Sequence, residues 1–149
     1  VGPAAYANRA KWPDLDMEGH PRIVPLGAAL DYAIERRDPD PRGWPIFGCD
    51  GLQGGTVSEA WVDRADRLIR YLAVDLPASG GTVLVPMMMV SVDRRQARIV
   101  CDAVTAAQFV DAPRIAAADH ITLYEEDRVL GYFGGGYLYA TPDRQEPFL

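Results

Sequence analysis

Residues 59–76 read EAWVDRADRLIRYLAVDL and carry the clearest fold signal in the chain. Alternation of side chains predicts two strands, one ending near residue 63 and one beginning near residue 68. The residues predicted to share one side of the first strand are Val57, Glu59, Trp61 and Asp63, and those of the second are Leu68, Arg70, Leu72, Val74 and Leu76. Each apolar face therefore carries ionisable groups.

Arg70 is the most demanding of these groups because an arginine in a protein does not lose its charge. If its face is covered, Arg70 needs a carboxylate within reach. The nearest candidates in sequence are Glu59, Asp63 and Asp66. In the alternative interpretation, Arg70 extends to solvent at the rim of a small barrel and the acids lie on a hydrated hairpin tip.

Composition limits the possible classes of protein. A chain of 149 residues with 48% hydrophobic residues suits one domain with a real core, and the net charge of −6 argues against non-specific binding to nucleic acid. Cys49 and Cys101 lie far apart, so we expect free thiols rather than a zinc site or a disulfide. No apolar run approaches the ~20 residues that cross a bilayer.

Three regions follow one another along the chain. Residues 1–42 are rich in proline and charge, which predicts an extended arm. Residues 43–110 hold five short β-rich runs, at 44–49, 55–63, 68–76, 82–86 and 98–100, whose spacing indicates a small antiparallel barrel. Residues 111–149 form a helical segment and tail. The predicted fold class is therefore mainly β with α.

The predicted C-terminal helix covers residues 123–139. Thr122 is a possible N-cap that forms a capping box with Glu125, and the early acids suit the positive end of the helix dipole. Three consecutive glycines, Gly134 to Gly136, weaken this helix by roughly 1 kcal/mol each. Either other parts of the protein pack on its aromatic end, residues 132–139, or the glycines mark where the helix stops.

No catalytic motif for acyl transfer, metalloproteolysis or phosphate binding is present. Asp16, Glu18 and His20 alternate, so in an extended arm they point the same way and could loosely hold a divalent cation or pass protons. The alternative is an exposed polar loop. The three methionines Met87 to Met89 fit a core or interface filler better than a cofactor site.

A family resemblance rests on motifs that occur in the same order over nearly the whole chain. They are LDMEGHPRIVPL at 15–26, WVDRAD at 61–66, IRYLAVDL at 69–76, VPM at 85–87, AAQFVDAPR at 106–114, ITLYEEDRV at 121–129 and GGGYLYATPDRQEP at 134–147. With these motifs the chain resembles the photosynthetic reaction centre H subunits of purple bacteria.

The resemblance implies a PRC-type barrel on the cytoplasmic face of the photosynthetic inner membrane, where it caps the L and M subunits. It implies a non-catalytic subunit that stabilises the complex around the quinones and conducts protons to the secondary quinone. The implied cofactors, namely bacteriochlorophyll, bacteriopheophytin, quinones and non-haem iron, belong to partner subunits, and none is bound by this chain alone. A cytochrome subunit, the light-harvesting antenna and membrane lipids are further neighbours that it allows.

The family also carries an N-terminal transmembrane helix that this sequence lacks, so we expect the chain to be the remaining portion of a longer or split subunit. Position by position, the resemblance assigns proton transfer to Asp16, Glu18, His20, Asp63 and Asp66. It assigns electrostatic support of the acids to Arg22 and Arg70. Glu18 stands where the family can have a second histidine, which argues against a surface metal site, and Asp66 stands where relatives have a glutamate.

Two other classes of protein remain open. A stand-alone PRC-barrel adaptor, such as the barrel of ribosome-maturation factors, would share the strands but would not need the acidic helix or the glycine-rich tail. A small enzyme that uses acidic residues would need a nucleophile or a bound metal, and no sequence feature supports one.

Overall fold

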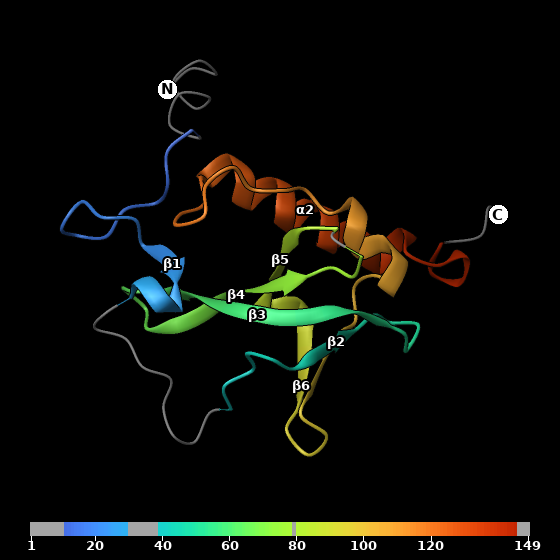
Figure 1. The fold of residues 1–149 in the computed structure, drawn as a ribbon. Coiled ribbons are helices and arrows are strands. Elements are labelled where there is room, and N and C mark those ends of the chain that lie inside the picture. Colours follow the sequence, from blue (N-terminus) through green and yellow to red (C-terminus); the bar gives the residue numbers. More distant parts are fainter. Residues whose placement is uncertain (1–10, 30–38, 79, 146–149) are drawn as a thin grey trace.

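The fold is a curved sheet with one long helix lying along it (Figure 1). The computed structural model describes residues 11–29, 39–78 and 80–145. Over these residues the strands are β1 (Ile23–Pro25), β2 (Pro45–Phe47), β3 (Gln53–Asp63), β4 (Leu68–Asp75), β5 (Thr82–Pro86), β6 (Val90–Asp93) and β7 (Arg98–Cys101). Helix α2 covers Leu123–Tyr139, and short 3₁₀ turns are η1 (Leu26–Ala28), η2 (Met87–Met89), η3 (Ala106–Asp111) and η4 (Pro142–Arg144).

The strand order is β5-β4-β3-β2-β7-β6, with β1 added beside β3. Neighbouring strands are antiparallel except for β2 and β7, which run parallel. Within the described residues no ladder joins β5 to β6, so hydrogen bonds do not close the barrel. The predicted class, mainly β with a C-terminal helix and a PRC-type barrel, is confirmed, although the sheet is not purely antiparallel.

The long hairpin of β3 and β4 departs from the simple alternation that the sequence predicts. Its register shifts between Val57 and Glu59 and again between Trp61 and Val62. Val57 lies opposite Val74, whereas Trp61 lies opposite Tyr71, so these two residues of β3 occupy different faces of the sheet. The prediction that they share a face is wrong because the first bulge inserts one residue into β3 and reverses the faces that follow.

Both faces of this sheet are covered, which explains the near-continuous apolar runs. The residues buried on one face of β3, β4 and β5 are Val57, Ala60, Leu72, Val74, Val83 and Val85, and those on the other are Trp61, Tyr71, Ala73 and Leu84. In Figure 1, α2 lies on one side of the sheet and the β6 hairpin projects on the opposite side. Cys49 and Cys101 are free thiols, as predicted.

Helix α2 begins and ends at the predicted residues. The Glu125 N–H donates to Thr122 Oγ1 (3.1 Å) and the Thr122 N–H donates to Glu125 Oε1 (3.0 Å), which completes the predicted capping box. The glycines do not stop the helix, because Val129, Phe133 and Gly136 pack against the rest of the protein. A Cβ on Gly136 would lie 2.4 Å from the Ala103 carbonyl oxygen, so this position requires glycine for a close approach.

Three short elements differ from the sequence-based expectation. The described part of the arm contains β1 and η1, and an isolated bridge pairs Pro13 with Thr122 at the start of α2. Strand β6 lies in a stretch that was not predicted to be a strand. The third is the 3₁₀ turn η3 (Ala106–Asp111), which lies at the end of the predicted barrel region and crosses its boundary at residue 110. Strands of three or four residues are too short to show a clear alternation of side chains, so pairing with distant strands determines whether they form.

Candidate functional site

The tight connection between β3 and β4 positions two of the predicted acids. Asp63 is the last residue of β3 and is only 1% exposed, whereas Asp66 lies in the turn. Asp63 Oδ1 accepts hydrogen bonds from the backbone N–H groups of Ala65 (2.9 Å) and Asp66 (3.0 Å). A side chain that accepts from residues two and three further on stabilises a turn, so Asp63 shapes the loop that carries Asp66.

Arg22 and Arg70 each donate hydrogen bonds to both of these carboxylates. Arg22 Nε donates to both oxygens of Asp63 (2.9 and 3.0 Å), and its Nη2 lies 2.7 Å from Asp66 Oδ2. Arg70 Nε donates to Asp63 Oδ2 (3.2 Å), and its Nη2 lies 3.2 Å from Asp66 Oδ2. We call Arg22, Asp63, Asp66 and Arg70 the acid–arginine cluster.

The cluster resolves the two interpretations of Arg70. Arg70 does pair with the predicted acids Asp63 and Asp66, and its side chain remains 43% exposed. Glu59, the third candidate, lies elsewhere: its carboxylate accepts from the Gly27 N–H and approaches Arg42. Arg70 is therefore both ion-paired and partly hydrated, which avoids the full desolvation cost of a buried ion pair.

The electrostatics favour the ionised form of Asp63. Burial is the largest single effect and raises the pKa of this carboxyl, but the Arg22 guanidinium and the N–H groups of Asp66 and Ala65 together outweigh it. The pKa of Asp63 therefore lies below its usual range. The hydrogen bond to Asp63 also raises the pKa of Arg22. Hydrogen bonds to the charged form of a group act in this direction.

The other three predicted residues form a second group beside the cluster. Asp16 Oδ1 accepts from the backbone N–H groups of Glu18 (2.9 Å) and His20 (3.0 Å), and the bond from His20 holds the pKa of Asp16 below its usual range. His20 Nδ1 lies 3.7 Å from Glu18 Oε2. Within the part of the chain that the structure describes, no group of three or more acidic, histidine or cysteine residues could hold a metal ion.

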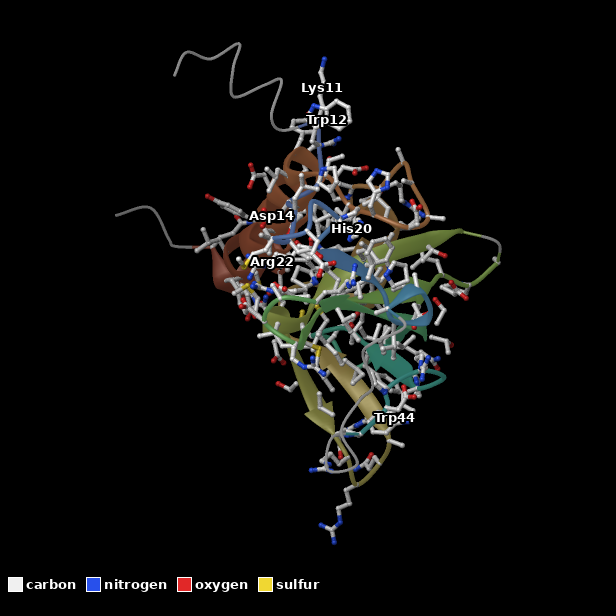
Figure 2. The ribbon with its side chains drawn as sticks, turned by 90° about the vertical axis from the view of Figure 1, so that its left-hand side faces the viewer. Lys11, Trp12, Asp14, His20, Arg22 and Trp44 are labelled. Atoms are coloured by element: carbon white, nitrogen blue, oxygen red, sulfur yellow. The ribbon has the colours of Figure 1, made fainter. Side chains whose placement is uncertain are left out.

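Arg64 links the two groups. Its Nη1 lies 3.7 Å from Asp16 Oδ2, and its backbone N–H donates to the Arg22 carbonyl (2.8 Å). Figure 2 shows the side on which Asp14, His20 and Arg22 lie, with Trp44 near the opposite end of the molecule. The structure thus brings the seven predicted residues to one region, as two adjacent groups rather than one.

Sequence reasoning missed a further carboxylate, Glu126 on α2. Tyr71 Oη, on β4, donates to Glu126 Oε1 (2.7 Å). Burial raises the pKa of Glu126 above its usual range, although the Tyr71 hydrogen bond opposes the shift. A signal was present: Glu126 precedes the buried Val129 by three residues and Phe133 by seven, so the helical period places it toward the packed face.

Comparison with known families finds two matches along the chain. Residues 33–108 match the family model of the PRC-barrel domain. The chain belongs to the PRC-barrel domain family. Residues 1–28 match the photosynthetic reaction centre H-chain N-terminal region, and the two matches together make this PRC-barrel protein reaction-centre H-like.

The acid–arginine cluster spans the two matched segments of the PRC-barrel protein. Arg22 comes from the H-chain segment, whereas Asp63, Asp66 and Arg70 come from the barrel. Asp14 and Asp16, which approach Arg22 and Arg64, also belong to the H-chain segment. None of the described helices is long and apolar enough to cross a membrane.

Proposed function

We propose that this PRC-barrel protein is a non-catalytic subunit of a photosynthetic reaction centre that conducts protons from the cytoplasm toward the secondary quinone. One observation carries the proposal: Arg22 of the H-chain-like segment binds the buried Asp63 of the barrel, so the junction between the two matched segments is itself an ionisable cluster. A stand-alone barrel adaptor would not need this junction.

The geometry suits the uptake and transfer of protons. In the proposed entrance Glu18 and His20 are exposed, Asp16 is only 14% exposed, and Arg64 lies between Asp16 and the acid–arginine cluster. A relay needs groups within reach of a hydrogen bond or one bridging water, and Asp66 is half exposed to that water. Asp63 and Asp66 share both arginines, so the two carboxylates belong to one network of ion pairs.

The proposed partners are the L and M subunits on the cytoplasmic side of the photosynthetic membrane, which this subunit stabilises around the quinone sites. Bacteriochlorophyll, bacteriopheophytin, quinones and non-haem iron would reside in those subunits and not in this chain. The cytochrome subunit, antenna and lipids of the same assembly are further candidate neighbours. The family resemblance supports these assignments, and the acidic net charge of −6 is consistent with a partner other than nucleic acid.

The outer side of α2 is the proposed contact with partner subunits. Within the described residues, outside the helix's own backbone and the adjoining residues, nothing lies within 4 Å of the place where a Cβ would stand on Gly131, Gly134 or Gly135. Folding of this chain therefore does not require these glycines, although each weakens the helix. Tyr137, Leu138 and Tyr139 are exposed at the same end. Amide exchange tests the contact: residues 131–139 should exchange more slowly in the assembled complex than in the free chain, and equal protection would contradict it.

A kinetic experiment tests the proton path. Asp63→Asn and Asp66→Asn together should slow the second electron transfer to quinone in the assembled complex, because that step consumes protons. Asp93→Asn is the matched control, since Asp93 also pairs with an arginine (Arg98, 3.1 Å) but lies in the β6–β7 hairpin. A rate in the double variant that equals the control's from about pH 6 to about pH 9 would reject the proposed path.

A further inference from the structure

A cavity connects the acid–arginine cluster with α2. Its volume is about 460 Å³, and it lies between β4, η2 and the helix. Its lining includes Arg70, Tyr71, Glu126, Leu68, Met88 and Leu130. Arg70 in its wall is also bonded to Asp63 and Asp66, so the cavity begins at the cluster. A water molecule occupies roughly 30 Å³ in the liquid and needs polar partners, and this cavity offers both room and partners.

Glu126 lies across this cavity from the cluster. Its carboxylate is bound by the Tyr71 hydroxyl (2.7 Å), and Tyr71 is only 2% exposed. The charged groups that act on Glu126 are Arg70 from β4, Asp14 from the N-terminal segment and Asp127 from α2 itself. Two of these three groups are acidic, and in the part of the chain that the structure describes no arginine pairs with Glu126 as Arg22 pairs with Asp63.

We propose that Glu126 is an additional proton-holding group of this protein, in exchange with Asp63 and Asp66 through water in the cavity beside Arg70 and Tyr71. The inference rests on the proposed function and extends its path to α2. In the exchange one proton leaves a carboxylic acid of the cluster, crosses the cavity on water and binds the Glu126 carboxylate, and no electron moves. Burial and the bond to Glu126 raise the pKa of Tyr71, so Tyr71 keeps its proton and orients the acceptor.

Infrared titration of the assembled complex tests whether Glu126 holds a proton. Above the usual pH range of glutamate titration, the unmodified protein should keep a carboxylic C=O absorption that Glu126→Gln removes. Asp127→Asn, at the next and exposed position of the helix, should keep the absorption but move its midpoint to lower pH, because Asp127 raises the pKa of Glu126. An absorption that survives Glu126→Gln would overturn the proposal.

Coupling to the cluster needs a second readout. Arg70 lowers the pKa of Glu126, so Arg70→Met should shift the midpoint of that absorption to higher pH, whereas Arg70→Lys, which keeps the charge, should not. Tyr71→Phe should also shift the midpoint upward because it removes a hydrogen bond to the carboxylate. An unchanged midpoint in both Arg70→Met and Tyr71→Phe would overturn the proposal.

The kinetic readout separates this inference from the proposed function. Glu126→Gln should slow the second electron transfer to quinone, as should the double replacement of Asp63 and Asp66. If only the double variant is slow, the path stands and Glu126 is not part of it. If neither variant is slow, the proposed function fails, and with it the role of Glu126 as a relay.

Discussion

Replacing Gly131, Gly134 and Gly135 by alanine should stabilise the free chain, whereas Gly136→Ala should destabilise it. The first three positions have open space where a Cβ would stand, so each change gains about 0.5–1 kcal/mol of helix propensity, or about 2 kcal/mol for the triple variant. At Gly136 the Cβ would lie 2.4 Å from the Ala103 carbonyl oxygen and 2.6 Å from Val104 Cγ1. Overpacking of this kind costs about 1–3 kcal/mol, which exceeds the gain in propensity.

Urea denaturation followed by far-UV circular dichroism measures these differences, provided that the dependence on urea is the same in all variants. A Gly136→Ala variant as stable as the unmodified chain would refute the packing argument, and so would a triple variant that is less stable. The same triple variant separates folding from assembly. If the open glycines face a partner subunit, added methyl groups should weaken assembly of the complex even though the free chain is more stable.

Three further predictions concern the cluster and the helix. Asp63→Asn leaves Arg22 and Arg70 without their buried carboxylate and should lower the free energy of unfolding, measured by urea denaturation, by about 2 kcal/mol. This loss is smaller than the roughly 3–5 kcal/mol expected for a fully buried pair, because both arginines are partly exposed. Asp66→Asn, whose side chain is half exposed, should cost less than about 1 kcal/mol, and equal losses would contradict the ranking. The lowered pKa of Asp63 gives stability that is present above about pH 4 and is lost as the pH falls toward the folded-state pKa, so acid denaturation of Asp63→Asn should be less steep. Thr122→Ala should cost about 1 kcal/mol and Thr122→Ser little, and equal stability of the two would argue against the cap.

The start of α2 could be predicted to the residue because it depends on local signals, whereas the sequence left open whether the glycines end the helix. Thr122 and Glu125 bond to each other's backbone within one turn, and no distant contact is needed to define that start. The bulges in the β3–β4 hairpin could not be predicted, because they depend on how two curved strands pair and not on either strand alone. Strand β1 is similar: three residues become a strand only because they lie beside β3.

The same difference between local and distant contacts applies to the candidate site. Arg70 lies in one hairpin with Asp63 and Asp66, seven and four positions away, so the sequence could name these acids as candidate partners, although it also named Glu59. Arg22 binds Asp63 from 41 positions away, and only the family resemblance pointed to it. Glu126 meets Tyr71 across 55 positions, and the helical period indicated its side of the helix but not its partner.

Asp63 and Glu126 are both largely buried carboxyl groups, yet their surroundings shift the two pKa values in opposite directions. Asp63 is almost fully buried, yet two guanidinium groups and two backbone N–H groups keep its charge favourable. Glu126 has one hydroxyl partner, and nearby acids oppose its charge. Burial therefore raises the pKa of Glu126, whereas the partners of Asp63 overcome the same effect. The two ends of the proposed path therefore differ in the protonation state that their surroundings favour.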